Sequence, residues 1–354
     1  MQSRQRGLVA ATICATALTA FVPQAADAGT RSRLSTKSVS FTVRNVNTSA
    51  LACPSDGAQY KVNGRLIAPA RTAGRARPRA VTLYLHEFSF GSFFWDYRGA
   101  KRFNYAVAQA RAGHTSVVID RLGYGTSGRP EGNQSCLGAQ ADVVHQVIGQ
   151  LRTGAYETGG SPTLTFRKVA LAGHSLGAQI ATVEAYSFKD VDALISISYS
   201  HQVSQRSFQS FYRAREVCLA GGELAGPSGP GGYAFFGQTP ADFQKNMFHS
   251  APRSIVRAVT RLRSRDPCGD SASLVPAIER DQKLLSQVAV PVLLVCGERD
   301  AIIPEFMCKN MKRWYRRAPV SITSVPDAGH ALTFERTAPV FRKKVSRWLQ
   351  KRGF

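Results

Sequence analysis

Apolar and polar positions alternate along the chain in two distinct ways. Short apolar runs bounded by turn residues predict strands at residues 38–46, 59–67, 80–86, 115–120, 168–172, 193–198, 290–296 and 320–325. Longer stretches with helical spacing predict helices at residues 99–112, 137–151, 176–186, 304–317 and 338–351. Strands that alternate with helices predict an α/β protein whose mostly parallel sheet carries helices on both faces.

The alternation stops after the sixth predicted strand. Residues 199–285 contain helical segments around a loop rich in glycine and proline, residues 221–232, but no strand-like run. Structureless loops of this length are rare in compact domains. We therefore expect a core formed by residues 29–199 and 286–354, with residues 200–285 inserted as a helical cap or lid.

The first 28 residues have the pattern of a signal peptide. Arg4 and Arg6 precede an apolar stretch, residues 8–22, and the small-x-small tripeptide of residues 26–28 follows. A buried N-terminal helix is the alternative, but Pro23 and the lack of a polar face disfavour it. The apolar stretch is also too short to span a bilayer comfortably. We expect an exported protein, secreted or extracytoplasmic, with no transmembrane segment in its mature form.

Composition and charge narrow the class of protein. Hydrophobic residues make up 44% of the 354 residues and charged residues 19%, which is typical of a globular chain. The formal net charge is +23, and removing Arg4, Arg6 and Asp27 gives 23 − 2 + 1 = +22. Such an excess favours electrostatic association with an anionic cell-envelope surface. The basic residues are spread along the chain, so specific nucleic-acid binding is not expected.

A candidate nucleophile lies where a predicted strand meets a helix. Gly173-His174-Ser175-Leu176-Gly177 has the spacing Gly-x-Ser-x-Gly, with the apolar run 169–172 before it. A sharp strand-to-helix turn needs small residues on both sides of the serine, and it exposes the hydroxyl above the sheet edge. The motif alone is weak; its position between strand and helix makes it specific.

A serine hydroxyl needs a base, and that base needs an orienting carboxylate. Asp300 follows the predicted strand at 290–296, and His330 follows the next strand, 320–325. Taken singly, Asp300 is also consistent with a helix cap and His330 with an ordinary loop residue. Together with Ser175 they give the chain order Ser, Asp, His and predict a catalytic triad.

With these motifs the chain resembles the α/β-hydrolase superfamily over most of its length outside the cap. Two further stretches carry the resemblance, Leu83-Tyr84-Leu85-His86-Glu87-Phe88 and the Asp-x-x-Gly-x-Gly-x-Ser loop of residues 120–127. The resemblance implies an oxyanion hole formed by the backbone N–H groups of Phe88 and Leu176. Glu87 stands where the family commonly has glycine. The resemblance implies no cofactor, and no pair of cysteines or histidines has metal-ligand spacing.

Six cysteines are left once Cys14 of the signal peptide is set aside from the seven. An even number in an exported chain favours disulfides, although six cysteines allow 15 pairings. Proximity in the inferred fold favours Cys218–Cys268 and Cys296–Cys308, which leaves Cys53–Cys136. Cys296 is alternatively a buried free thiol within its strand.

The expected function is cleavage of a carboxylic ester, from a small-molecule or lipid-like substrate of apolar character. Aromatic residues of the cap and of the loop after residue 86 are candidates for an apolar pocket or for packing between cap and core: Phe88, Phe90, Phe93, Phe94, Trp95, Tyr233, Phe235, Phe236, Phe243 and Phe248. The same triad also serves lyases, acyltransferases and amidases. A different class of function is a non-catalytic protein that binds the cell envelope.

Overall fold

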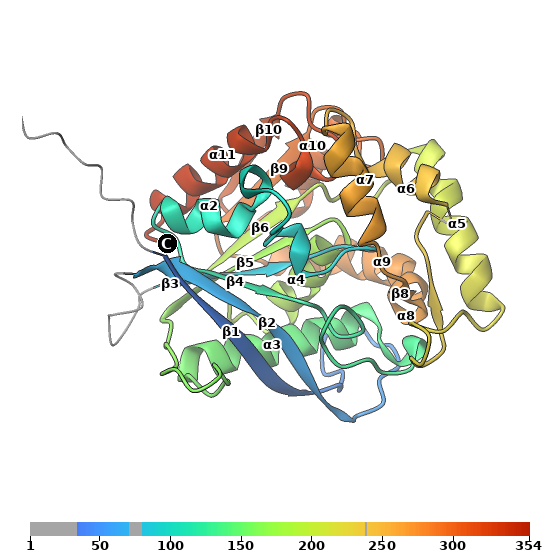
Figure 1. Ribbon diagram of the computed structural model, residues 1–354, viewed down its shortest axis with the longest axis horizontal. Coiled ribbons are helices and arrows are strands. Elements are labelled where there is room, and N and C mark those ends of the chain that lie inside the picture. Colours follow the sequence, from blue (N-terminus) through green and yellow to red (C-terminus); the bar gives the residue numbers. More distant parts are fainter. Residues whose placement is uncertain (1–33, 71–79, 238) are drawn as a thin grey trace, which may run out of the picture. The chain divides into compact units, whose positions relative to one another are not determined.

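An eight-stranded sheet runs through the protein in the computed structural model, which describes residues 34–70, 80–237 and 239–354 (Figure 1). The predicted signal peptide lies outside the described residues. In chain order the strands are β1 (Leu34–Arg44), β2 (Gln59–Pro69), β3 (Ala80–Leu85), β4 (Ser116–Ile119), β5 (Lys168–His174), β6 (Ala193–Ile197), β9 (Val292–Gly297) and β10 (Val320–Val325). In space they follow the order β1-β2-β4-β3-β5-β6-β9-β10.

The sheet is mostly parallel, as predicted. Strands β1 and β2 pair antiparallel, and β2 also runs antiparallel to β4, whereas every later neighbour pair is parallel. The central strands β4 and β6 are buried at every position. Burial on both faces explains why these strands read as continuous apolar runs. The carboxyl ends of β3, β5, β9 and β10 thus lie at one edge of the sheet, where ligand sites form in such folds.

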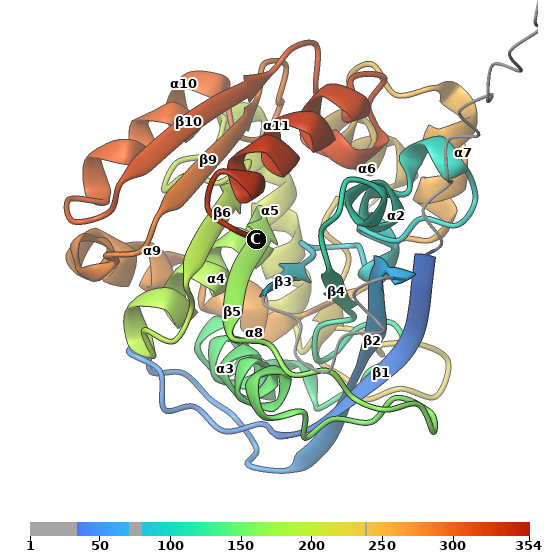
Figure 2. The same ribbon diagram turned by 90° about the vertical axis from the view of Figure 1, so that its left-hand side faces the viewer.

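Helices cover both faces of the sheet (Figures 1 and 2). Helices α2 (Tyr105–Arg111) and α11 (Ala338–Gln350) lie on one face, and α3 (Leu137–Thr153) and α4 (Leu176–Ser187) on the other. The predicted helix at 99–112 begins only at Tyr105, because the side chain of Asn104 caps it by accepting a hydrogen bond from the N–H of Val107. The predicted helix at 304–317 is α10 (Glu305–Asn310) followed by a 3-10 turn, Met311–Trp314.

The chain between β6 and β9 is mainly helical. It contains α5 (Gln205–Leu219), α6 (Pro240–Met247), α7 (Arg253–Arg261), α8 (Cys268–Ala272) and α9 (Leu274–Leu284). The prediction that this stretch has no strand is wrong in one respect. Two two-residue strands, β7 (Tyr233–Ala234) and β8 (Asp266–Pro267), pair antiparallel there. Strands this short leave no periodic signal in a sequence.

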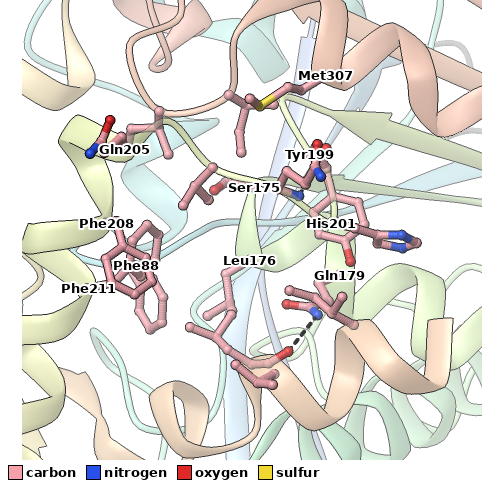
Figure 3. Close-up of a pocket in the computed structure, with 18 residues that line it drawn as sticks. Phe88, Ser175, Leu176, Gln179, Tyr199, His201, Gln205, Phe208, Phe211 and Met307 are labelled. Carbon is pink, nitrogen blue, oxygen red and sulfur yellow. Dashed lines mark hydrogen bonds between the residues drawn. The ribbon is translucent and has the colours of Figure 1, made fainter. Parts of the chain in front are cut away.

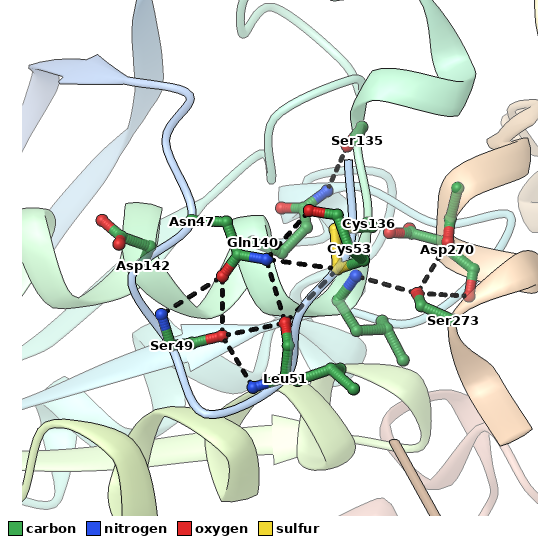
Figure 4. Close-up of a disulfide and its surroundings, with 12 residues drawn as sticks. Asn47, Ser49, Leu51, Cys53, Ser135, Cys136, Gln140, Asp142, Asp270 and Ser273 are labelled. Carbon is green, nitrogen blue, oxygen red and sulfur yellow. Dashed lines mark hydrogen bonds between the residues drawn. A yellow bond between two sulfur atoms is a disulfide. The ribbon is translucent and has the colours of Figure 1, made fainter. Parts of the chain in front are cut away.

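The six cysteines of the described chain pair as the inferred fold favoured. The bonds are Cys53–Cys136, Cys218–Cys268 and Cys296–Cys308. Figure 4 shows the first of them, which joins the loop after β1 to the residue that precedes α3. In that loop the Asn47 side chain donates to the carbonyl oxygens of Leu51 (2.9 Å) and Cys53 (3.0 Å). The alternative of a free thiol at Cys296 is therefore wrong.

Among the described residues, none of the helices has both the length and the apolar character needed to cross a bilayer.

Candidate active site

Ser175 occupies a strained turn between β5 and α4. Its backbone has φ 51° and ψ −116°, a combination that side-chain-bearing residues rarely adopt. The Ser175 N–H donates to the carbonyl oxygen of Ile197 at the end of β6, which ties the turn to the sheet (2.8 Å). The local geometry is that of a nucleophile elbow, which lifts a hydroxyl above the carboxyl edge of a parallel sheet.

The glycines on either side of Ser175 are required by backbone contacts. A Cβ on Gly173 would lie 2.1 Å from the carbonyl oxygen of Gly177, and a Cβ on Gly177 would lie 2.6 Å from that of His86. Both contacts are with backbone atoms, which cannot move aside as a flexible side chain would. The Gly-x-Ser-x-Gly spacing is thus explained by the close approach of β5, α4 and the end of β3.

The structure brings Asp300 and His330 together in the interior. Asp300 follows β9 and His330 follows β10, and neighbouring parallel strands end side by side. His330 Nδ1 donates to both oxygens of Asp300, at 2.9 and 2.8 Å. Oδ1 of Asp300 also accepts from the N–H groups of Ile302 and Ile303. Asp300 therefore orients the ring and also closes its own turn, but it does not cap a helix, because Pro304 is the N-cap of α10 and no side chain caps that helix.

The loop after β3, which carries Phe88, is held from two sides. On one side, buried His86 accepts from the Arg121 N–H through Nε2 (3.0 Å), so its Nδ1 carries the proton and donates to the Glu87 carbonyl oxygen (2.8 Å). Burial, and then Arg121, place the pKa of His86 well below its ordinary value, which keeps this ring neutral. Arg121 in turn pairs with the buried carboxylate of Asp270 (3.0 Å).

On the other side, the loop is bound to the segment between β6 and β9. Asp266 in β8 accepts hydrogen bonds from the N–H groups of Ser89, directly after Phe88, and of Phe236. Ser89 has φ 63°, so this turn is also strained and needs external support. Burial raises the pKa of Asp266 to about 7, although the two N–H donors oppose the shift. The N–H groups of Phe88 and Leu176 donate to no acceptor within the described ranges.

Glu87 is the residue that sequence reasoning missed. Its buried carboxylate lies between two histidines, with Oε2 3.2 Å from His330 Nε2 and Oε1 3.0 Å from His174 Nδ1. Burial would raise the pKa of Glu87, but His330 and His174 outweigh it and lower the pKa to about 2. Burial also disfavours a charged His330, yet Asp300 and Glu87 together raise its pKa to about 10.

His174, beside the nucleophile, also contributes to this arrangement. Its Nε2 donates to the carbonyl oxygen of His330 (2.8 Å), and its ring stacks on Phe94 with centroids 4.5 Å apart. No hydrogen bond joins Ser175 to His330 among the described residues, because Nε2 of His330 faces Glu87 instead. For Glu87, the sequence signal was a carboxylate directly after an apolar strand, among aromatic residues.

Two groups of described side chains bring three ligand-type atoms within 4.8 Å of one another, Glu87–His174–His330 and His145–Glu184–Asp190. In the first, ring nitrogens and carboxylate oxygens are paired at hydrogen-bond distance, as expected for shared protons. In the second, burial and then Asp190 raise the pKa of Glu184 well above its ordinary value. A side-chain hydrogen bond joins two members of each group, His330 to Glu87 (3.2 Å) in the first and His145 to Asp190 (2.7 Å) in the second.

A cavity of ≈780 Å³ opens in front of Ser175 (Figure 3). Phe88, Ser175 and Leu176 all line it, so the candidate nucleophile and both candidate oxyanion residues share one space. The rest of the wall is largely apolar and is built from four places in the chain: Phe208 and Phe211 of α5; Leu274, Val275 and Ile278 of α9; Ile302 and Ile303 after β9; and Met307 of α10. Tyr199, His201 and Gln179 supply polar atoms.

Most of the aromatic residues expected at this pocket lie elsewhere. Of that set only Phe88 lines the cavity. Phe90 packs against Phe94 and Phe243, with ring centroids 4.9 and 5.5 Å apart, and also stacks on Phe334. These rings hold the loop after β3 against the segment between β6 and β9. For Phe90, Phe94 and Phe243 the interpretation as pocket residues is therefore wrong, and the interpretation as packing residues is correct. Nothing in the sequence separately indicated Phe208 and Phe211 as pocket residues.

Comparisons with known proteins agree with the geometry. Residues 51–343 match the family model described as the alpha/beta hydrolase family. A search of curated proteins finds no significant match. A thermophilic esterase from Thermogutta terrifontis is similar in structure, with 20% identity over 88% of this chain and 98% of that one and a TM-score of 0.58.

Two further solved structures share the fold at low identity. A hydrolase from Pseudomonas aeruginosa aligns at 16% identity over 87% of this chain and its whole length, with a TM-score of 0.59. A monoacylglycerol lipase from Paleococcus ferrophilus aligns at 20% identity over 76% of this chain and 93% of its own, with a TM-score of 0.54. A match over residues 51–343, on a sheet of this order with a serine elbow after β5, means that the chain belongs to the alpha/beta hydrolase family.

Proposed function

We propose that the protein is an exported serine hydrolase that cleaves carboxylic esters of apolar character. The observation that carries the proposal is the position of Ser175, on a strained elbow that faces a large and mostly apolar cavity. The buried Asp300–His330 pair at the same edge of the sheet supports it, because the pair supplies a base and its orienting carboxylate. Cavities of several hundred Å³ accommodate ligands of drug-like or short-lipid size.

In the proposed reaction Ser175 Oγ attacks the ester carbonyl carbon, and the hydroxyl proton passes to Nε2 of His330. The N–H groups of Phe88 and Leu176 stabilise the negative oxygen of the tetrahedral intermediate. Nε2 then gives the proton to the leaving alkoxide, which departs as the alcohol and leaves an acyl group on Ser175. A water molecule, deprotonated by the same histidine, releases the carboxylic acid. Asp300 keeps Nδ1 protonated and stabilises the ring when it becomes charged.

Residues 200–285 act in this proposal as a cap that selects the substrate. Phe208, Phe211 and Ile278 reach the cavity from α5 and α9, both of which belong to this stretch. The side chains of Phe208 and Val275 are more than half exposed, so the mouth of the cavity is itself apolar. An apolar mouth and wall favour an acyl chain or aromatic group over a charged substrate.

Export and association with an anionic cell envelope are also part of the proposal. Three disulfides are compatible with an oxidising compartment. The net charge of +23 attracts anionic surfaces in a salt-dependent way. Fractionation of the producing cells at low and high salt tests this part, since a freely secreted protein would show no salt-dependent retention.

The contact between Glu87 and His330 favours a second candidate, a non-catalytic binding protein on the hydrolase fold. A base whose Nε2 already faces a carboxylate is not available to Ser175. Other chemistry of the same triad, by a lyase, acyltransferase or amidase, has no specific observation in its favour. Hydrolysis of p-nitrophenyl esters from acetate to decanoate, measured between pH 7 and 10.5, separates these functions. Turnover supports the proposal, and its absence at every pH and chain length supports the binding protein.

We expect Ile278→Trp to shift the preferred acyl chain towards shorter esters. Ile278 lines the cavity from α9, and an indole there fills space that a long chain would occupy. The kcat/KM for decanoate should fall about tenfold or more, while that for acetate changes much less. Ile322→Trp, on strand β10 away from the cavity wall, is the matched control. An equal loss of kcat/KM for acetate and decanoate would show that Ile278 does not contact the acyl chain.

A further inference from the structure

We propose that Glu87 is a positioning residue that keeps His330 protonated at rest, so that hydrolysis begins only under alkaline conditions. The inference rests on the proposed function, because only a catalytic base has to lose this proton. Glu87 follows β3 and reaches His330 across 243 residues of sequence. Its carboxylate lies at hydrogen-bond distance from Nε2, the nitrogen to which a serine hydroxyl would donate.

The inference is based on the hydrogen bonds of the His330 ring. His330 Nδ1 lies 2.8 Å from Asp300 Oδ2, and Nε2 lies 3.2 Å from Glu87 Oε2. An ionised carboxylate only accepts hydrogen bonds, so both ring nitrogens must donate. A neutral imidazole has one N–H; the imidazolium has two. The two carboxylates therefore select the charged ring, which has no lone pair for the proton of Ser175.

Titratable groups face these two residues from several elements, and the two carboxylates are the ones that favour the charged ring. Asp300 approaches His330 from the end of β9, and Glu87 approaches it from the end of β3. His174, from the end of β5, has its Nδ1 3.0 Å from the other oxygen of Glu87, and together with His330 it favours the ionised carboxylate. His86, whose Nδ1 donates to the Glu87 backbone, is neutral and adds no charge. Arg121 and Asp270 lie behind His86 as an ion pair.

The backbone at Glu87 is held by the fold. The His86 hydrogen bond holds its carbonyl oxygen, and Asp266 holds the N–H of Ser89 two residues later. The side chain is buried, so water does not screen its charge. For catalysis, hydroxide must first remove the proton from Nε2, giving water and a neutral ring. That ring then accepts the Oγ–H proton as the bond from Oγ to carbon forms, and returns it to the leaving alkoxide.

The test compares the pH dependence of wild type and Glu87→Gln. Hydrolysis of ethyl butyrate, followed by titration of the acid released, gives kcat/KM from pH 6 to 11, whose acid limb reports the free-enzyme base. We expect the acid limb of the wild-type profile to lie at alkaline pH, and that of Glu87→Gln to lie at least about one pH unit lower. The variant should therefore be about tenfold or more faster at pH 7.5. Superimposed limbs would overturn the proposal.

Glu184→Gln is the matched control. Glu184 is equally buried but lies on α4 away from His330, and its raised pKa makes it neutral in the fold, so an amide replaces it closely. Its profile should follow that of the wild type. A shift as large as that of Glu87→Gln would assign the effect to loss of any buried acid and overturn the proposal.

A measurement that needs no turnover separates this inference from the proposed function. In Ser175→Ala protein, the NMR signal of the His330 Cε1–H group is followed from pH 6 to 11 and identified by its loss in Ser175→Ala/His330→Gln. We expect it to titrate in the alkaline range, and at lower pH when Glu87→Gln is added. Titration near neutral pH in the Ser175→Ala protein alone would refute the role of Glu87, whether or not the second variant folds. Absence of esterase activity with an alkaline titration would refute only the hydrolase.

Discussion

Replacing Ser175 by alanine is expected to lower kcat for any hydrolysed ester by at least about 10³-fold, because removal of the nucleophile abolishes the acyl-enzyme route. The fold should be retained. Alanine is smaller than serine, and the hydroxyl of Ser175 makes no hydrogen bond that supports the turn within the described chain. Steady-state hydrolysis at about pH 10, together with the thermal midpoint of each protein, measures both expectations.

Ser200→Ala is the matched control for this prediction. Ser200 lines the same cavity, and its hydroxyl accepts one hydrogen bond from the N–H of Gln202 (3.2 Å). It is not part of the elbow, so we expect kcat within a few-fold of the wild type. Equal residual activity in the Ser175 and Ser200 variants would show that turnover does not depend on the elbow serine.

Removing the Cys53–Cys136 disulfide is expected to lower the free energy of unfolding by about 4–5 kcal/mol. The bond closes a loop with a sequence separation of 83 residues, and the entropy it removes from the unfolded chain grows with loop length. The bond also anchors the loop that precedes β2 to the start of α3 (Figure 4). Urea denaturation of Cys53→Ala/Cys136→Ala against wild type measures the loss.

The Cys296–Cys308 bond provides an internal comparison. Its sequence separation is 12 residues, so the same argument gives a loss of about 3 kcal/mol for Cys296→Ala/Cys308→Ala. Both cysteines of this pair are buried, whereas Cys53 is only partly buried, so lost packing adds to the loss expected for the short loop and reduces the difference between the two variants. If removal of the Cys296–Cys308 bond lowered the free energy of unfolding more than removal of the Cys53–Cys136 bond, chain entropy would not be the main source of disulfide stabilisation in this protein.

The parts that the sequence predicted well are those encoded locally. The β5–Ser175–α4 elbow depends on glycines within two residues of the serine, and its strand and helix have clear periodic patterns. The Asp300–His330 contact was predictable because strand order places both residues at one sheet edge. The start of α2 at Tyr105 was missed because the cap at Asn104 lies inside the predicted helix.

The parts that were missed depend on contacts between distant segments. Tertiary packing decides whether a phenylalanine lines the cavity or packs in the core. Phe88 lines the cavity and Phe90 packs on Phe243, although the two are only two residues apart. The importance of Glu87 arises from a histidine 243 residues away and another beside the nucleophile. A departure from the family pattern marked the position, but only the folded chain shows its partners.

The central claim is that Ser175 is an activated nucleophile, and covalent labelling tests it most directly. Wild-type protein is treated with a fluorophosphonate at about pH 10, digested and mapped by mass spectrometry. The account predicts one phosphonylated peptide, modified at Ser175, and no adduct in Ser175→Ala or after heat denaturation. An unlabelled Ser175 in folded protein at that pH, or an adduct on another residue, would contradict it.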